Sequence, residues 1–134
     1  MQRAAVIGVG QIGKEHARIY ASLTGLRLIG VCDLDPQRGR EIADQYRTDY
    51  FRDCRDLLGR VDAVSVAVPT ERHCEIACQF LENGVSALVE KPISRTLEEA
   101  DAMIRLAASN GVVLQVGHLE RFNPSVRALS EIVR

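Results

Sequence analysis

The sequence predicts an α/β fold: a doubly wound parallel sheet of about six strands with helices on both faces. Short runs rich in β-branched residues alternate along the whole chain with stretches of helical spacing. A glycine-rich turn joins the first such run to the first helical stretch. No repeat, low-complexity tract or Pro/Gly-rich linker interrupts the 134 residues, so residues 1–134 are expected to form one domain.

The first half of the chain predicts three strands. Asp35 and Pro36 mark the start of the second helix, because a proline at the first helical position gives up an amide that has no partner there. Asp53 is expected to cap a brief helix in the same way. The expected elements are, in order, a strand at 4–7, a helix at 12–23, a strand at 26–32, a helix at 36–46, a strand at 49–51 and a short helix at 54–58.

The second half continues the alternation. Thr96 and Glu99 have the spacing of a capping box, and Gly111 is expected to stop the helix that they open. The expected elements are a strand at 63–68, a helix at 69–82, a strand at 85–89, a helix at 97–110, a strand at 112–116 and a helix from 124 into 134. The last helix shows no stop signal, so we expect the chain to be part of a longer protein.

The glycine-rich turn has the form Gly-x-Gly-x-x-Gly and sits between a strand and a helix, as a dinucleotide pyrophosphate requires. Gly8 permits the tight turn, and Gly10 lets the backbone approach the phosphates. Gly13 lets the helix pack closely on the strand, and the free amides of that helix face the anion. The turn predicts dinucleotide binding; the alternative is a glycine-rich turn in a purely structural sheet.

Asp33 ends the second predicted strand, twenty residues after Gly13, where a ribose-binding carboxylate is expected. A carboxylate accepts hydrogen bonds from both ribose hydroxyls and repels a 2′-phosphate, so Asp33 favours NAD over NADP. Arg38 lies close enough to weaken this preference. We therefore expect NAD as the cofactor, with NADP as the less favoured alternative.

Ligands of such sheets bind at the carboxyl ends of the strands, and several polar residues follow strands here. Lys91 stands at this edge in Glu90-Lys91-Pro92, where the proline restricts the backbone and a neutral lysine could act as a general base. The alternative is a solvated surface charge. The same edge carries Thr70, with His73 one turn later, and His118 with Arg121.

Alternatives remain for these further residues. His73 is either a packed or capping histidine or a cofactor contact. His118 and Arg121 follow the sixth strand and could face a substrate, while Arg121 could equally be a surface charge.

Composition and charge narrow the classes of partner, location and metal site that this protein is expected to have. The net charge of −1 gives no electrostatic argument for a nucleic acid or an anionic membrane as partner. No stretch approaches the roughly 20 apolar residues of a transmembrane helix, so we expect a cytoplasmic protein. The four cysteines form no C-x-x-C pair and are expected to be free thiols, without a metal site; His73, Cys74 and Cys78 are the weak alternative.

With these motifs in order, the chain resembles the N-terminal domain of the glucose-fructose oxidoreductase, inositol dehydrogenase and MocA (Gfo/Idh/MocA) family, which has a Rossmann fold. The matching pieces cover essentially the whole chain and are Gly8 to Gly13, Cys32-Asp33, Val68-Pro69-Thr70 with His73, Glu90-Lys91-Pro92 and Gly117 to Pro124. The Glu-Lys-Pro triplet and the segment ending in Pro124 discriminate well, whereas the glycine motif does not.

The resemblance implies hydride transfer between a nicotinamide cofactor and a hydroxyl or carbonyl carbon of a sugar, cyclitol or nucleotide sugar. Lys91 would hold the reacting hydroxyl and help to move its proton. Glu90 and Lys91 would also lie near the nicotinamide ribose and bind the cofactor there. Thr70 and His73 would flank the cofactor, and Gln11 and Ile12 would contact it within the glycine turn. The segment from Gly117 looks closest to members that act on UDP-N-acetylglucosamine-type sugars at carbon 3.

Family members carry a second domain that supplies substrate contacts and an oligomer interface. The resemblance therefore implies a two-domain, homo-oligomeric enzyme of which this chain is the cofactor domain, inactive on its own. Two other functions stay open: a nucleotide-sensing module without chemistry, and a relative of biliverdin or imine reductases.

Overall fold

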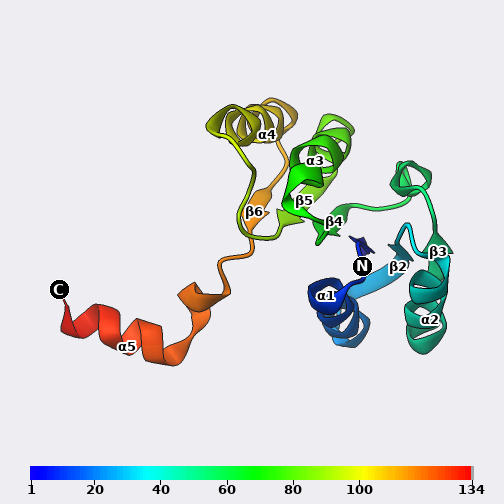
Figure 1. Ribbon diagram of the computed structural model, residues 1–134, viewed down its shortest axis with the longest axis horizontal. Coiled ribbons are helices and arrows are strands. Elements are labelled where there is room, and N and C mark those ends of the chain that lie inside the picture. Colours follow the sequence, from blue (N-terminus) through cyan, green and yellow to red (C-terminus); the bar gives the residue numbers. More distant parts are fainter. Residues whose placement is uncertain (134) are drawn as a thin grey trace.

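The computed structural model describes residues 1–133 as six parallel strands covered by helices on both faces (Figure 1). The sheet has the strand order β3-β2-β1-β4-β5-β6, which confirms the predicted doubly wound topology. The strands are β1 (Gln2–Ile7), β2 (Leu26–Cys32), β3 (Asp49–Phe51), β4 (Ala63–Val66), β5 (Ser86–Val89) and β6 (Leu114–Val116).

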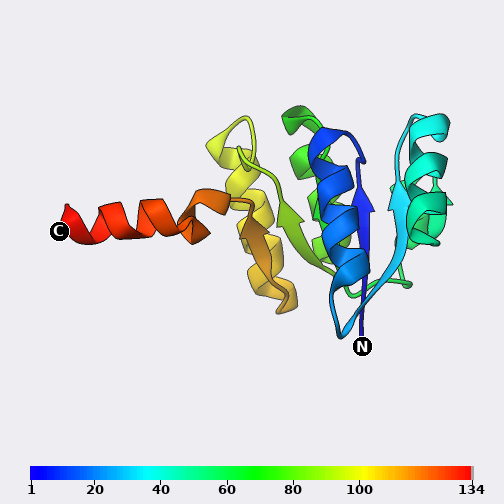
Figure 2. The ribbon, with the colours of Figure 1, turned by 90° about the horizontal axis from the view of Figure 1, so that it is seen from below.

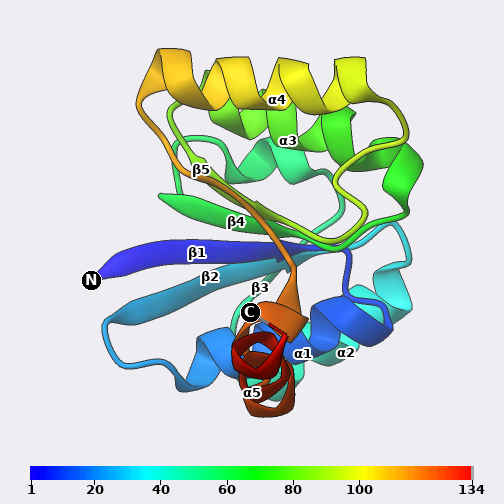
Figure 3. The same ribbon diagram turned by 90° about the vertical axis from the view of Figure 1, so that its left-hand side faces the viewer.

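The helices divide between the two faces of the sheet. Figure 3 shows α3 and α4 on one side and α1 and α2 on the other. The α-helices are α1 (Gln11–Ser22), α2 (Pro36–Tyr46), α3 (His73–Glu82), α4 (Leu97–Asn110) and α5 (Pro124–Ile132). Three 3₁₀ turns complete the chain: η1 (Cys54–Leu57), η2 (Thr70–Arg72) and η3 (Leu119–Phe122). Within residues 1–133 no helix is long and apolar enough to cross a membrane.

The predicted helix caps form as expected. The Asp35 carboxylate accepts hydrogen bonds from the amides at 37 and 38, and Pro36 opens α2. The Thr96 hydroxyl accepts one from Glu99 N, while the Glu99 carboxylate reaches Arg95 N, one residue before the position of a standard capping box. Gly111 ends α4 in the left-handed region, at φ 64°.

Several predicted bounds were wrong by a few residues. Strand β4 ends at Val66, two residues early, and the helix expected from 69 divides into η2 and then α3. The segment 54–58 forms a 3₁₀ turn rather than an α-helix. Strand β6 begins at Leu114 rather than 112, and η3 was not expected. Short elements depend on pairing across the sheet, which a local pattern does not record.

Successive side chains of β1 point to opposite faces of the sheet and so contribute to the hydrophobic cores on both faces. Ala5 and Ile7 belong to the core beneath α3 and α4, whose largest buried side chains include Phe80 and Met103. Val6, between them in sequence, points to the opposite core beneath α1 and α2. The sheet is thus buried on both faces, and its carboxyl edge is left for ligands.

Helix α5 stands apart from this body. Figure 2 shows it extending away from the sheet beyond β6. It has no buried residue, and it exposes the apolar side chains of Val126, Leu129 and Ile132.

Candidate functional site

The glycine turn closes tightly between β1 and α1. Gly8 adopts φ +82°, a conformation that other residues rarely take, and its amide donates a 2.8 Å hydrogen bond to the Cys32 carbonyl oxygen. A Cβ on Gly13 would lie only 1.7 Å from the Gly8 carbonyl oxygen. Gly13 is therefore required by the close contact of helix and turn, as its position in the motif predicts.

Gly10, unlike Gly13, is not in close contact with other atoms. A Cβ there would meet nothing within 4 Å, so the space above this residue is open. Gly10 is also the N-cap of α1, and no side chain caps the helix. The first amides of α1 thus remain available to an anion, and their dipole favours one. Gln11 and Ile12 lie on this first turn with exposed side chains.

Asp33 is held at the end of β2 by protein donors. Its carboxylate accepts hydrogen bonds from Val9 N at 2.9 Å and from Asp35 N at 2.9 Å. Arg38 binds it through two nitrogens, Nε at 3.1 Å and Nη2 at 2.8 Å. Burial acts to raise the pKa of Asp33, but the hydrogen bonds from Arg38 and the two amides outweigh it, so its pKa is lowered. Asp33 is therefore an anion beside the glycine turn.

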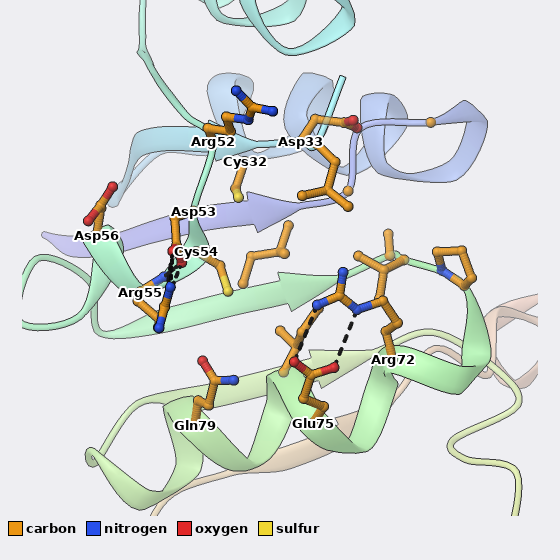
Figure 4. Close-up of a pocket in the computed structure, with 18 of the residues that line it drawn as sticks. Cys32, Asp33, Arg52, Asp53, Cys54, Arg55, Asp56, Arg72, Glu75 and Gln79 are labelled. Carbon is orange, nitrogen blue, oxygen red and sulfur yellow. Dashed lines mark hydrogen bonds and ion pairs between the residues drawn. The ribbon is translucent and has the colours of Figure 1, made fainter. Parts of the chain in front are cut away.

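A cleft of about 870 Å³ opens beside these residues (Figure 4). Gly8, Gly10, Asp33 and Arg38 line it, so the structure brings four of the predicted cofactor residues together. The opposite wall comes from η1, η2 and α3, and there Arg72 at the end of η2 pairs with Glu75 of α3. Its volume lies in the range of small-molecule and cofactor sites.

The far wall of this cleft was not predicted from the sequence. Arg52, Cys54, Arg72, Glu75 and Gln79 line it but carry no motif. The available signal was the position of most of them, just after β3 or around the start of the helix after β4, at the carboxyl edge; Gln79 lies further along that helix.

Lys91 lies on the same edge of the sheet, after β5, and outside the large cleft. Its side chain is exposed, and the Lys91–Pro92 peptide bond is cis. The neighbouring Glu90 is only 8% exposed, and its Oε2 accepts a 3.3 Å hydrogen bond from Lys91 N. The triplet therefore presents the amine to solvent while its carboxylate is buried.

His73 is buried, with 1% of its surface exposed. Its Nε2 lies 2.8 Å from the Val68 carbonyl oxygen, and its Nδ1 lies 3.0 Å from that of Pro92. Of the two roles that the sequence left open, this geometry favours the packed one: His73 joins the segment after β4 to the segment after β5. Thr70, at the start of η2, is half-buried.

His118 precedes η3 and Arg121 lies within it, and both are exposed. His118 lines a small hollow of about 170 Å³ that it shares with Glu90 and His16. Arg121 does not line either cavity. The edge thus has two parts, a large cleft beside Asp33 and a smaller hollow beside Glu90.

Comparison with known proteins identifies the family of the chain. The model of an oxidoreductase family with an NAD-binding Rossmann fold, GFO_IDH_MocA, matches residues 2–118. The chain belongs to this family. The match confirms the resemblance, the fold and the NAD cofactor predicted from the sequence.

Several individual proteins of known activity or structure are similar to this chain. The chain is 40% identical over 129 residues to UDP-N-acetylglucosamine 3-dehydrogenase of Acidithiobacillus ferrooxidans, covering 96% of this chain and 41% of the relative. The solved structure of that enzyme superposes with a TM-score of 0.91 at 39% identity, covering 98% of this chain and 43% of the other. GenD2 from gentamicin A biosynthesis, solved in complex with NAD, gives a TM-score of 0.84 at 30% identity, with coverage of 87% and 34%.

Two other curated relatives differ in their reactions. One is 2,7-anhydro-N-acetylneuraminate hydratase of Mediterraneibacter gnavus, 34% identical over 96% of this chain and 34% of its own length. The other is scyllo-inositol 2-dehydrogenase (NAD(+)) of Bacillus subtilis, 35% identical over 92% of this chain and 37% of its own length. The chain thus spans between one third and about two fifths of the curated relatives that it matches.

Proposed function

We propose that the protein containing this chain is an NAD-dependent dehydrogenase that oxidises a ring hydroxyl of a nucleotide sugar, with this chain as its cofactor domain. The observation that carries the proposal is the position of Lys91, exposed on the same edge of the sheet as the glycine turn. The similarity to UDP-N-acetylglucosamine 3-dehydrogenase supports the substrate class.

The residues at this edge fit a dinucleotide. The open space above Gly10 and the uncapped start of α1 suit a pyrophosphate, since backbone amides can reach it without a side chain between. Asp33 and Arg38 lie beside them in the cleft and would hold the adenosine ribose. NAD, when bound, supplies the acceptor for a hydride.

Lys91 is proposed to hold the reacting hydroxyl and to take its proton on Nζ. Its exposed amine can reach a substrate bound over the ends of β5 and β6, where His118 and Arg121 are proposed to contact the sugar. Thr70 is half-buried at the start of η2, next to the end of β4, and is proposed to line the path of the cofactor. The proposed roles are to position the cofactor and the sugar and to transfer a proton, and the side chains present can fill these roles.

We also propose a second domain outside this chain. The curated relatives are longer than the chain by more than a factor of two. The apolar side chains that α5 exposes, Val126, Leu129 and Ile132, suit a covered surface. That region would complete the substrate site and form a homo-oligomer interface.

The test uses the full-length protein with UDP-N-acetylglucosamine and NAD, following NADH formation by absorbance. Lys91→Ala should lower kcat roughly 100-fold or more while NADH affinity changes little. Equal turnover in the variant would contradict the role of Lys91. The exposed Lys14, beside the glycine turn on α1, provides a matched control as Lys14→Ala.

The same assay separates the alternatives. A sensing module would bind NADH without turning over any sugar, and Lys91→Ala would leave its ligand affinity intact. A hydratase would change the substrate without net NADH formation. A relative of imine reductases would consume NADH with an imine and show no activity on UDP-sugars. Any of these three results would overturn the proposed reaction.

A further inference from the structure

A largely buried polar chain crosses from α1 to the edge that carries Lys91, and of its four members only Glu90 belongs to a motif described above. Its members are His16 and Tyr20 on α1, Ser65 on β4 and Glu90 after β5. Ser65 has no exposed surface, and His16 and Glu90 have 9% and 8%. Polar groups with so little exposed surface need polar partners nearby.

Ser65 links the two side chains of α1. Its Oγ lies 2.7 Å from His16 Nδ1 and 3.0 Å from the Tyr20 hydroxyl oxygen. A serine hydroxyl carries one hydrogen and two acceptor lone pairs, so Ser65 can take part in both contacts at once. Together they join His16 and Tyr20 of α1 to β4.

The opposite ring nitrogen faces Glu90. His16 Nε2 lies 3.0 Å from Glu90 Oε1. Among residues 1–133, His16 is the one basic side chain within 4 Å of that carboxylate. Oε1 has no hydrogen-bond partner in the described part of the chain, so this 3.0 Å contact is a close polar approach rather than a hydrogen bond. It places the imidazole directly against a carboxylate that is only 8% exposed.

Two further features hold the carboxylate in place. Oε2 accepts the hydrogen bond from Lys91 N, so the carboxylate is attached to the peptide that carries the lysine. A Cβ on Gly117 would lie 2.7 Å from Oε1, so the end of β6 leaves room for Glu90 only because residue 117 is a glycine. Glu90 is therefore enclosed by α1, by its own peptide and by the end of β6.

We propose that His16 is a positioning residue, which acts through Glu90 to fix the Glu90–Lys91 peptide and so to hold the lysine side chain at the cofactor edge. The chain Tyr20–Ser65–His16 supports this role from beneath. The inference rests on the proposed function for the catalytic use of Lys91, but the positioning itself is a property of this chain.

The first test compares amide spectra of the chain by ¹⁵N NMR. His16→Ala should shift or broaden the Lys91 and Gly117 amide signals, while Arg18→Ala, at an exposed position on the same helix, should leave them unchanged. His16→Gln, which keeps a polar group near Glu90, should restore most of the original positions. Unchanged Lys91 and Gly117 signals in a folded His16→Ala chain would overturn the proposal.

The second test measures turnover in the full-length protein. His16→Ala should lower kcat roughly 10- to 100-fold with KM for NAD within about twofold, because misplacing a reacting group costs rate more than affinity. His16→Gln should recover most of the loss. Combining His16→Ala with Glu90→Ala should be no slower than Glu90→Ala alone, since His16 acts through Glu90. Fully additive losses would overturn the proposal.

Folding and function are kept apart in these tests. If circular dichroism shows that His16→Ala does not fold, Ser65→Ala replaces it, because this substitution removes only the hydroxyl beneath the ring. Ser65→Ala should give the same amide shifts and a several-fold loss of kcat. No effect in either measurement would overturn the proposal. A full-length protein that is inactive on every sugar would contradict the proposed function, whereas the amide comparison would still decide the positioning role.

Discussion

Replacing two glycines of the same turn by alanine should affect two different properties: stability at Gly13 and NADH affinity at Gly10. In Gly13→Ala the new methyl group would lie 1.7 Å from the Gly8 carbonyl oxygen, whereas real contacts of this kind are almost never under 3.0 Å. The obstacle is backbone, so α1 must move away from the turn. We expect a loss of at least about 3 kcal/mol in the free energy of unfolding, or a fall in Tm of roughly 10 °C.

Gly10→Ala meets no such obstacle. The methyl group has nothing within 4 Å, and the residue lies at φ −67° in the extended region that alanine also adopts. We expect the free energy of unfolding to change by less than about 0.5 kcal/mol. The same methyl group occupies the open space proposed for the pyrophosphate, so NADH affinity should fall roughly tenfold or more, about 1.4 kcal/mol.

Urea unfolding followed by circular dichroism measures the first quantity, and NADH fluorescence titration measures the second. The two variants control for each other, since one should lose stability and the other affinity. A Gly13→Ala chain as stable as the parent would refute the packing argument. A Gly10→Ala chain that binds NADH as tightly as the parent would refute the placement of the pyrophosphate.

Three further predictions concern the body of the domain. Arg3 holds the pKa of Asp62 at about 2, below its ordinary 3.8, by a side-chain hydrogen bond, so this pair stabilises the fold above about pH 4 and the contribution is lost between pH 4 and 2. Arg3→Ala should raise the Asp62 midpoint toward 3.8 in a ¹³C NMR titration; a parent midpoint already at 3.8 would contradict this. Burial raises the pKa of Cys32 to about 12, so mass spectrometry should find it unalkylated by iodoacetamide at pH 8 until the chain unfolds, and rapid native alkylation would contradict this. Phe80→Ala should cost about 3–5 kcal/mol in urea unfolding against under about 0.5 kcal/mol for the exposed Leu97→Ala, and equal costs would count against the core assignment.

Much of the cofactor side of the site could be predicted from the sequence. Gly8, Gly10, Asp33 and Arg38 line one cleft, and their positions follow from a local motif and from strand ends that must share an edge. The contacts of these residues with NAD stay a prediction. The cleft wall made by Arg72 and its neighbours carries no motif; only its place after strand ends was a signal, because the wall itself depends on how η1 and α3 pack on the sheet.

The sequence by itself determined the alternation of elements, the sheet topology and the turn that receives a dinucleotide. These follow from patterns within ten to thirty neighbouring residues, which periodicity, caps and glycine spacing record. Only the tertiary structure decided the surroundings of Glu90 and Lys91. His16, Ser65 and Gly117 come together there from α1, β4 and the end of β6, and their contacts depend on strand register and helix packing between residues far apart in the chain. The glycine turn thus follows from local sequence, while the support beneath the lysine is a property of the folded sheet.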